Sequence, residues 1–252
     1  MAGSGKRTAL ITGAARRIGR AIAQRLAGEG WALALHSSER SVGEAVALAS
    51  LLRARGADVM LVAGDLADPF CPQTLIDEAL AQAGSLQLLV NNASIFEPDS
   101  ARALNVELWD RHFAINLRAP VALAGHFARA CGDNEGAIVH IIDQRVLRLT
   151  PRYFSYTLAK SALWTATQTM AQEFAPRIRV NAVGPGPVLP NQNEGGDGFA
   201  REAASVPLEH AVDPSEIADA VAWLAQARSV TGQMICVDSG QHLAWKTPDA
   251  LL

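Results

Sequence analysis

The stretch TGAARRIG, residues Thr12 to Gly19, decides the predicted fold. The apolar run Ala9–Ile11 before it is typical of a strand, and a helical pattern follows it. Gly13 and Gly19 stand where a phosphate-binding loop needs a tight turn and close packing of a helix on a strand. Arg17 occupies the place where such a loop usually has a second glycine. The stretch therefore predicts a strand, a phosphate-binding turn and a helix, with a cation inside the turn.

Outward from this stretch, short β-rich apolar runs alternate with longer helical patterns. The alternation predicts an α/β fold: a doubly wound parallel sheet of about seven strands, with right-handed crossovers and helices on both faces. The predicted strands are Thr8–Thr12, Ala32–His36, Asp58–Ala63, Leu86–Asn91, Ala137–Ile142, Ile178–Ala182 and Gln233–Val237. The predicted helices are Ile18–Gly28, Val42–Gly56, Pro72–Ala83, Val106–Ala130, Tyr153–Ala175 and Pro214–Ala225.

The 252 residues, 49% of them hydrophobic, predict one domain with one core. Residues 1–6 are predicted to be a flexible leader and residues 241–252 a tail. Residues 188–206 follow the sixth strand, and their first half is rich in Gly, Asn and Asp. This composition predicts either a mobile flap over a site or a simple surface loop.

Composition argues against several classes of protein. A net charge of -3 does not suit a dedicated nucleic-acid binder. No stretch approaches the ~20 apolar residues that span a bilayer, and the first residues lack the apolar run of a signal peptide. Cys71, Cys131 and Cys236 are odd in number and widely spaced, so they indicate neither a disulfide framework nor a metal site. A reducing cytoplasmic location is therefore predicted.

Chemistry-bearing residues follow the predicted strands in order. Asp65 in GDL closes the third strand, and Asn91–Ser94 (NNAS) closes the fourth. Tyr156 and Lys160 lie four residues apart, on one face of a predicted helix. A lysine ammonium near a tyrosine lowers the tyrosine pKa from its usual value near 10, which suits proton transfer. The competing interpretation is a packed ring beside a solvated amine.

Taken together, these motifs resemble the short-chain dehydrogenase/reductase family over essentially the whole chain. The resemblance continues through Asn116 in INLRAP, the run NAVGPGPV and the run TGQMICVDSG. It implies a Rossmann-type fold, a nicotinamide cofactor whose ribose Lys160 binds, and a water held by Asn116 in a proton path. A homotetramer is also implied, although Ser239 stands where the family commonly has glycine.

Departures from the family pattern resemble the pteridine reductases. These are the Arg16–Arg17 pair, Phe96 in NNASIFEP, and Asp143, thirteen residues before Tyr156, where the family usually has serine. The resemblance implies that Arg17 reaches over the cofactor phosphates toward a pterin and that Asp143 acts with Tyr156 in protonating it. Ser94 and Phe96 would hold the pterin ring against the nicotinamide. Alternatively, Arg17 points to solvent, Asp143 pairs with Arg145 or caps a turn, and Phe96 is a core residue.

The end of the second strand favours NADPH over NADH. No acidic residue stands at His36 or in the Ser37-Ser38 pair that follows it, whereas an acid there would bind an unphosphorylated ribose. Arg40 and Ser41 supply a cation and a donor for a 2′-phosphate. Glu39 leaves an NAD site open as the alternative.

The predicted site residues form three overlapping sets. The catalytic set is Asp143, Tyr156, Lys160 and Asn116. The cofactor-binding set is Gly13, Arg16, Arg17, Ile18, Gly19, His36, Ser37, Ser38, Arg40, Ser41, Asp65, Leu66, Asn92, Ala93, Ser94, Tyr156, Lys160, Pro185, Gly186 and Val188. The substrate-binding set is Arg17, Ser94, Phe96, Asp143, Tyr156 and Leu189. Leu208, His210 and Trp245 are predicted to lie at either the substrate pocket or a subunit interface.

The predicted function is NADPH-dependent reduction of a ring C=N bond in a small pterin-type substrate, such as a dihydropterin or a dihydrofolate. One alternative is a carbonyl reductase or alcohol dehydrogenase of the same family that acts on a ketone or a sugar. A second alternative is a catalytically silent NADP-binding regulator.

Overall fold

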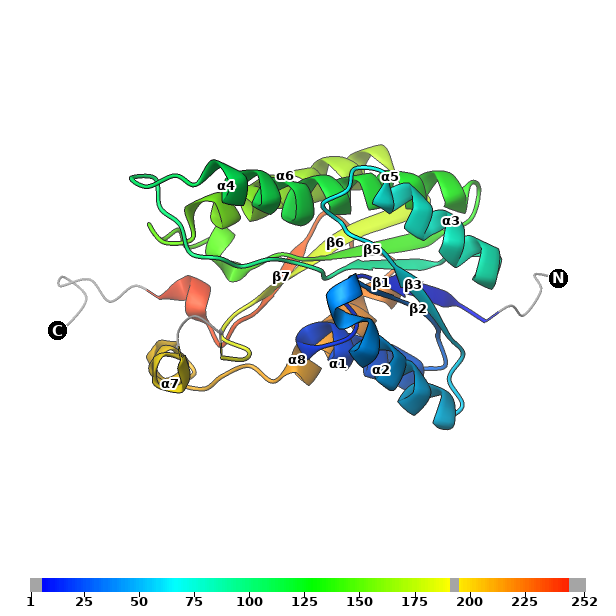
Figure 1. Cartoon of the computed structure of the whole chain (residues 1–252), viewed down its shortest axis with the longest axis horizontal. Helices are drawn as coiled ribbons and strands as arrows, with labels where there is room; N and C mark the ends of the chain where they lie inside the picture. Colours follow the sequence, from blue (N-terminus) through cyan, green and yellow to red (C-terminus); the bar gives the residue numbers. More distant parts are fainter. Residues whose placement is uncertain (1–5, 191–194, 245–252) are drawn as a thin grey trace.

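Seven parallel strands form one sheet in the computed structural model, which describes residues 6–190 and 195–244 (Figure 1). Their order is β3-β2-β1-β4-β5-β6-β7. The strands are β1 (Thr8–Ile11), β2 (Ala32–Ser37), β3 (Val59–Ala63), β4 (Leu88–Asn91), β5 (Gly136–Ile141), β6 (Ile178–Pro185) and β7 (Met234–Val237). The predicted doubly wound α/β fold is confirmed.

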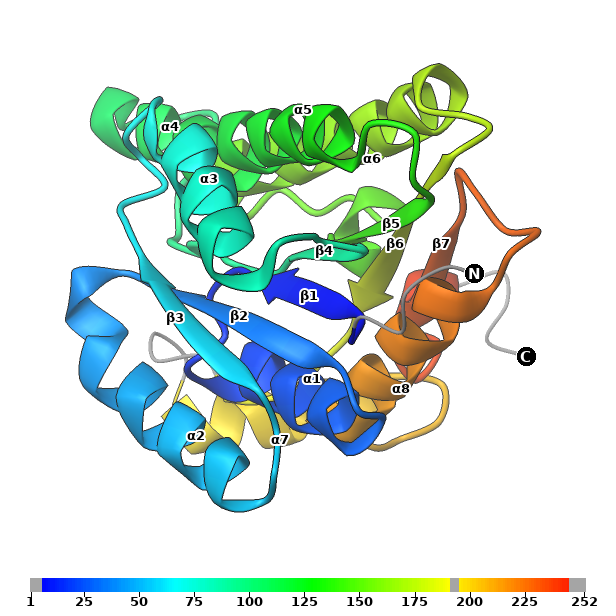
Figure 2. The ribbon, with the colours of Figure 1, turned by 90° about the vertical axis from the view of Figure 1, so that its right-hand side faces the viewer.

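Helices cover both faces of the sheet (Figures 1 and 2). One face carries α1 (Arg17–Gly28), α2 (Val42–Ala54) and α8 (Pro214–Gln226). The other carries α3 (Cys71–Ala83), α4 (Val106–Phe113), α5 (Ala119–Cys131) and α6 (Phe154–Glu173). Both faces being covered explains why every residue of β1 and β2 is buried.

The chain changes direction across the sheet between β1 and β4. It runs from β1 outward to β2 and β3, and then returns to β4 on the other side of β1. Parallel pairing of Leu10 with Leu89 sets the register of these two central strands. Their carboxyl ends therefore meet at the topological switch point, where ligands bind in doubly wound sheets.

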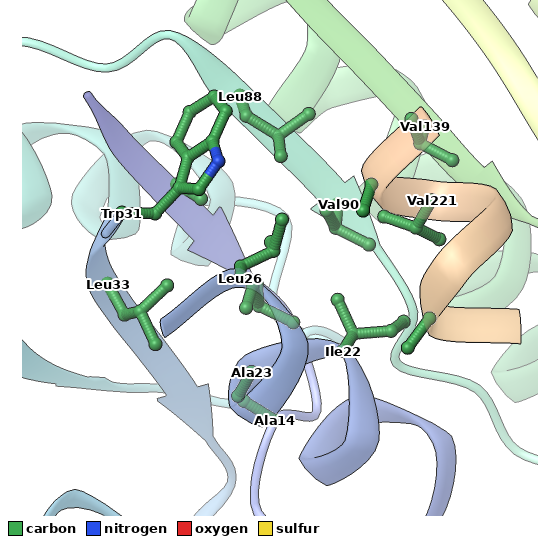
Figure 3. Packing of buried hydrophobic residues seen from close by; sticks show 14 of the residues in the cluster. Ala14, Ile22, Ala23, Leu26, Trp31, Leu33, Leu88, Val90, Val139 and Val221 are labelled. Atoms are coloured by element: carbon green, nitrogen blue, oxygen red, sulfur yellow. The ribbon is translucent and has the colours of Figure 1, made fainter. Parts of the chain in front are cut away.

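Helix α1 is held by one apolar stripe (Figure 3). Ile22, Ala23 and Leu26 are fully buried and belong to one cluster with Val221 of α8 and Val90 of β4. Their spacing of three and four residues places them on one helix face. Burying each large apolar side chain contributes roughly 1.5–3 kcal/mol. The stripe thereby fixes the start of α1 at the carboxyl edge of the sheet.

Two segments differ from the predicted elements. The predicted helix Val106–Ala130 is interrupted by the π-helical turn η2 (Ala114–Arg118), which separates α4 from α5. The predicted irregular segment 188–206 contains α7 (Gly195–Ser205), so the loop prediction is wrong there. The second half of that segment contains Ala, Arg and Glu, which favour helix, whereas the glycines and asparagines before them determined the prediction.

Short 3-10 turns complete the described elements: η1 (Glu39–Ser41), η3 (Gln144–Val146) and η4 (Gln241–Leu243). Most of the predicted leader, most of the predicted tail including Trp245, and positions 191–194 of the predicted flap lie outside the described residues. Within the described part of the chain, no helix combines the length and apolar character needed to cross a bilayer.

We expect Gly19→Ala to lower the free energy of unfolding by about 2 kcal/mol, because a side chain at this position overpacks the turn. An added Cβ would collide with the Gly13 carbonyl oxygen and lie 2.6 Å from Asn92 Nδ2. Gly28→Ala, on the same helix, is the matched control, because a Cβ there meets nothing within 4 Å. Urea unfolding of both variants tests this. Equal stability of the two variants would contradict the role assigned to Gly19.

Candidate active site

The turn after β1 has two residues with left-handed backbone. Gly13 has φ +62° and Arg17 has φ +50°. Glycine adopts this conformation freely, whereas arginine is strained in it. Arg17 therefore replaces a glycine by taking the backbone conformation of one, and its side chain leaves the turn.

Asn92, just after β4, holds this turn. Its Nδ2 donates to the carbonyl oxygens of Thr12 at 2.9 Å and Gly13 at 3.0 Å. In return, Thr12 Oγ1 accepts from the backbone N–H groups of Asn92 at 2.9 Å and Ala93 at 3.0 Å. The carboxyl ends of β1 and β4 are thus tied together at the switch point.

His36 supports the turn from β2. The Gly13 N–H donates to His36 Nδ1 at 3.2 Å, so the proton is on Nε2, which lies 3.1 Å from the Gly64 carbonyl oxygen. Burial lowers the pKa of His36 and keeps the ring neutral. Both ring nitrogens are used inside the protein, and His36 therefore links the turn to the end of β3.

The start of α1 is suited to an anion. Among the described residues, no acidic side chain lies in its first turn and no side chain caps it. Its N–H groups and the positive end of the helix dipole therefore remain for a ligand. Arg16 forms only a surface ion pair with Glu44 at 3.7 Å. A hollow of about 350 Å³ between α1 and α2 is lined by Ala15, Arg16, Arg17, Arg20, Glu44, Ala47 and Leu48.

The Arg17 side chain crosses from this turn to the segment after β6. Its Nη1 donates to the Pro190 carbonyl oxygen at 3.1 Å and its Nη2 to that of Leu189 at 3.2 Å. Although the residue is exposed, partial burial and then the neighbouring Arg16 lower the pKa of the guanidinium. The guanidinium is therefore held by protein carbonyls, unlike a side chain directed only into water. Its contact with a substrate stays a prediction.

Asp143 and Tyr156 form the chemical centre of the site. Asp143 follows β5, and Tyr156 lies in the first turn of α6. The Tyr156 hydroxyl donates to Asp143 Oδ2 at 3.0 Å. Asp143 Oδ1 accepts from the Arg145 N–H at 2.8 Å and so caps η3. One carboxyl group therefore both caps the turn and contacts the predicted catalytic tyrosine.

Burial determines the protonation of this pair. It raises the pKa of Asp143 against the opposing effect of Arg145. It also raises the pKa of Tyr156 well above its ordinary value, and the Asp143 carboxylate adds to that effect. Tyr156 therefore keeps its proton and presents it to the carboxyl group.

The prediction that Lys160 lowers the tyrosine pKa is wrong for this arrangement. Lys160 Nζ donates to the Ile141 carbonyl oxygen at 2.8 Å and lies 5.8 Å from the centroid of the Tyr156 ring. The side chain is almost fully buried, and burial lowers its own pKa to about 8. Burial and then the carboxylate that accepts the Tyr156 hydroxyl therefore set the direction of the Tyr156 pKa shift.

Phe96 lies beside the pair and is only half-buried, which argues against a core role. Its ring stacks on Tyr153 with centroids 3.9 Å apart and planes 12° apart. It meets the Tyr156 ring edge-on at 4.6 Å. The guanidinium carbon of Arg145 lies 5.8 Å from the Phe96 centroid and 5.3 Å from that of Tyr153. Sequence reasoning missed Tyr153 and Arg145 as site residues, although both lie within three residues of the predicted pair.

Asn116 lies in the π-helical turn η2, a geometry that is frequent at functional sites. Its Oδ1 accepts from the Ile95 N–H at 3.0 Å and from Ser94 Oγ at 3.0 Å, and its Nδ2 donates to the Ile95 carbonyl oxygen at 2.9 Å. The side chain therefore holds the segment that carries Ser94. The predicted role of Asn116 in binding a water stays a prediction.

Most of the other predicted residues lie at or just after the carboxyl ends of strands, whereas Leu208 and His210 lie beyond α7. Asp65 is exposed after β3, and its Oδ1 accepts from the Ala67 N–H at 2.9 Å. Gly186 follows β6, and an added Cβ there would lie 2.8 Å from the Cβ of Asp238. His210 contacts Ser239 Oγ at 3.3 Å, and Leu208 is exposed. The remaining predicted cofactor residues are Ile18, Ser37, Ser38, Arg40, Ser41, Leu66, Pro185 and Val188.

Cys236, Asp238 and His242 form a cluster with ligand-type atoms within 4.8 Å of one another. Asp238 accepts from the Gly240 N–H at 3.0 Å, and from the backbone N–H and Nδ1 of His242 at 2.7 Å each. These hydrogen bonds close the turn η4 after β7. The cluster therefore has a structural role in that turn.

Known proteins match this chain over nearly its whole length. The family model described as Enoyl-(Acyl carrier protein) reductase matches residues 13–242. The structure of FolM Alternative dihydrofolate reductase 1 from Brucella canis complexed with NADP is 45% identical, covers 98% of this chain and 99% of that one, and has a TM-score of 0.90. Its counterpart from Brucella suis in complex with NADP is 46% identical, covers 96% of this chain and 98% of that one, and has a TM-score of 0.89.

A more distant relative is the 3-oxoacyl-[acyl-carrier-protein] reductase FabG of Staphylococcus aureus. It is 30% identical over 94% of this chain and 98% of its own length. Because the family model and these relatives span nearly the whole chain, the protein belongs to the short-chain dehydrogenase/reductase family.

Proposed function

We propose that the protein reduces a ring C=N bond of a pterin-type substrate, a dihydropterin or a dihydrofolate, with NADPH as the reductant. The observation that carries the proposal is the hydrogen bond of 3.0 Å between the Tyr156 hydroxyl and the Asp143 carboxyl group, beside the half-buried ring of Phe96. A serine at position 143 would suit a carbonyl oxygen, whereas a carboxyl group suits ring N–H and amino groups. Similarity to two NADP complexes of an alternative dihydrofolate reductase supports the same substrate class.

The residues present fit NADPH. Gly13 and Gly19 allow the tight turn that a phosphate-binding loop needs, because a Cβ at either would crowd Asn92. The free N–H groups of α1 bind the pyrophosphate, and the arginine-lined hollow next to α1 favours a 2′-phosphate. Tyr156 and Lys160 hold the nicotinamide ribose, and the backbone after Pro185 holds the carboxamide. When bound, NADPH supplies the hydride.

Asp143, supported by Tyr156, supplies the proton. The raised pKa of Asp143 keeps a protonated fraction at higher pH than an exposed aspartate has. The protonated carboxyl group donates to a ring nitrogen, directly or through water, and water then restores its proton. The Tyr156 hydroxyl holds the carboxyl group in place through its hydrogen bond to Oδ2. Both groups stay close together, because Asp143 follows β5 and α6 packs against the neighbouring strand β6.

The Phe96 ring and Ser94 hold the substrate ring. Stacking of a flat heterocycle on a phenyl face adds on the order of 1 kcal/mol beyond the burial of apolar area. Arg17 and Leu189 close the opposite side, since their hydrogen bond already joins the cofactor turn to the segment after β6. The guanidinium there stays charged, and the N–H groups that do not bind Leu189 and Pro190 remain to contact a phosphate or a ring carbonyl.

A carbonyl reductase is the second candidate, favoured by the similarity to the Staphylococcus aureus FabG protein. A panel of dihydrobiopterin, dihydrofolate, a 3-oxoacyl thioester and simple ketones, followed by NADPH oxidation, separates the two. Turnover of the thioester or a ketone alone would replace the pterin proposal. Absence of NADPH oxidation with every compound would favour the silent regulator.

We further propose a homotetramer in the cytoplasm. The outer face of α4 and α5 has a hollow of about 740 Å³ lined by Asp110, Phe113, Ala114, Leu117, Arg118, Val121 and Ala122. Val106, which begins α4, is 63% exposed, although apolar. An apolar face of this kind suits an interface between copies of the chain. The three cysteines are free, as in proteins of a reducing compartment. Light scattering after gel filtration measures the assembly.

We expect Asp143→Ala and Tyr156→Phe each to lower kcat by about 100-fold, because each removes one member of the proton-supplying pair. The dissociation constant of NADPH should stay within about twofold in the Asp143 variant, since this side chain is placed on the substrate side. Steady-state kinetics with dihydrobiopterin and fluorescence titration with NADPH measure the two quantities. Full turnover in both variants would refute the roles assigned to this pair.

Reduction should slow as the pH rises through the pKa of Asp143. Burial raises this pKa, and so the proton-donating form persists above the usual aspartate range and is lost only at higher pH. In Tyr156→Phe the fall in kcat/KM should occur at still higher pH, because the lost hydroxyl had lowered the pKa of Asp143. In Asp143→Asn this fall in kcat/KM with rising pH should be absent. Profiles of kcat/KM against pH for the wild type and both variants test this. An unchanged fall in Asp143→Asn would mean that another group causes the pH dependence.

Substitutions at Arg17 should separate the effect of losing the guanidinium contacts from the effect of the strained backbone at this position. Arg17→Ala and Arg17→Gly both remove the guanidinium and should raise the KM for substrate and for NADPH about tenfold, as the loss of one charged hydrogen bond does. Glycine at φ +50° should be about 1 kcal/mol more stable than alanine. Arg55→Ala, an exposed arginine beyond α2, serves as the control. Unchanged KM values in both Arg17 variants would favour a purely structural arginine.

A further inference from the structure

Three polar side chains form a chain of hydrogen bonds next to Phe96 and Tyr156. His112 Nδ1 lies 2.6 Å from Ser155 Oγ, and Ser155 Oγ donates to Asp99 Oδ2 at 2.5 Å. His112 and Ser155 have no exposed surface. Buried polar groups are costly unless they are satisfied, so a chain of this kind is specific in its geometry.

The protons in this chain have one consistent direction. The Glu97 N–H donates to His112 Nε2 at 3.4 Å, so this nitrogen carries no proton. The proton is therefore on Nδ1, which donates to Ser155 Oγ, and the serine hydroxyl donates to the Asp99 carboxylate. Burial lowers the pKa of His112, against the opposing effect of Asp99 and Glu97, and so favours this neutral form.

The chain joins three parts of the fold. Asp99 and Glu97 belong to the segment after β4, His112 lies on α4, and Ser155 lies in the first turn of α6. Both oxygens of Asp99 also accept from the Ser155 N–H, at 3.2 and 3.1 Å. A carboxylate is favourable at this end of a helix. The segment is therefore attached to α6 at the residue directly before Tyr156.

Phe96 lies between two such attachments. On one side, Asn116 holds both backbone groups of Ile95. On the other side, His112 holds the Glu97 N–H. The Phe96 ring projects from between them onto Tyr156, whose ring lies 6.0 Å from that of His112. The position of Phe96 relative to Tyr156 thus depends on both attachments.

We propose that His112, Ser155 and Asp99 are positioning residues for the reduction proposed above. They fix the ring of Phe96, on which the substrate ring is proposed to stack, relative to the hydroxyl of Tyr156. Displacement of catalytic groups by about 1 Å costs up to about 100-fold in rate, so a fixed separation has kinetic value. This inference rests on the proposed function for the identity of the substrate. The simpler interpretation is that Asp99 only caps α6, which predicts lower stability with unchanged KM and kcat.

Two substitutions of one residue separate these interpretations. In His112→Asn, the amide nitrogen takes the place of Nδ1 and keeps the donor to Ser155, but the acceptor for Glu97 is lost. In His112→Gln, the amide oxygen takes the place of Nε2 and keeps that acceptor. We expect His112→Asn to raise the KM for dihydrobiopterin about tenfold with kcat within about twofold, and His112→Gln to restore the KM.

Ser155→Ala breaks the chain at the other end, next to Tyr156. It should lower kcat about tenfold, because the start of α6 loses its side-chain link to the substrate segment. Thr167→Val is the matched control, because Thr167 is a buried hydroxyl of α6 that donates only to the Leu163 carbonyl oxygen of the same helix. NADPH titration counts the folded sites in each variant. Kinetic constants per folded site equal to those of the wild type in both His112→Asn and Ser155→Ala would overturn the proposal.

Hydrogen exchange tests the network without reference to turnover. Peptides that cover residues 94–99 should exchange faster in His112→Asn and Ser155→Ala than in the wild type, and at the wild-type rate in His112→Gln and Thr167→Val. If His112→Asn and Ser155→Ala exchange faster but the protein does not reduce pterins, the proposed substrate is refuted and the network proposal stands. Unchanged exchange in His112→Asn and Ser155→Ala would refute the network in an active enzyme as well.

Discussion

The structure depends on the hydrogen bonds by which Asn92 holds the carbonyl oxygens of Thr12 and Gly13. They join the carboxyl ends of β1 and β4, the two strands between which the chain changes direction across the sheet. The phosphate-binding turn leaves from β1, and the segment with Ser94 and Phe96 leaves from β4. One side chain therefore sets the distance between the cofactor end and the substrate end of the site, and no domain movement is needed to bring them together.

Burial determines the protonation states of the residues at the chemical centre. Asp143, Tyr156 and Lys160 lie at the same edge, and in each of them removal from water disfavours the charged form. A carboxyl group that keeps a proton is a proton donor, and a phenol that stays protonated holds that carboxyl group by its hydrogen bond. Reduction of a C=N bond consumes a proton, whereas oxidation of an alcohol needs a base. The electrostatics of the pair therefore favour the reductive direction, which is independent of the sequence similarities.

The sequence was enough to predict the order of strands and helices, because alternating apolar runs and the Gly13–Gly19 turn depend on local patterns. The resemblance to the pteridine reductases also implied that Asp143 acts with Tyr156, and the Tyr156 hydroxyl indeed lies 3.0 Å from Asp143 Oδ2. The sequence did not predict the direction of the Tyr156 pKa shift, because that depends first on how deeply the hydroxyl is buried and then on the carboxylate that accepts it. Nor did it indicate His112 or Asp99, whose importance arises from contacts across 43 and 56 residues.

Arg17 shows how a local cost is balanced by a distant contact. A left-handed arginine is strained by about 1 kcal/mol or more, and glycine at that position would remove the strain. Only a side chain, however, reaches Leu189 and Pro190 beyond β6. Two charge-assisted hydrogen bonds to carbonyl oxygens offset the strain and tie the segment after β6 to the turn after β1. Arg17 thus joins the turn after β1 to the segment after β6, and Asn92 joins the same turn to β4. The carboxyl ends of three strands are therefore connected in one site.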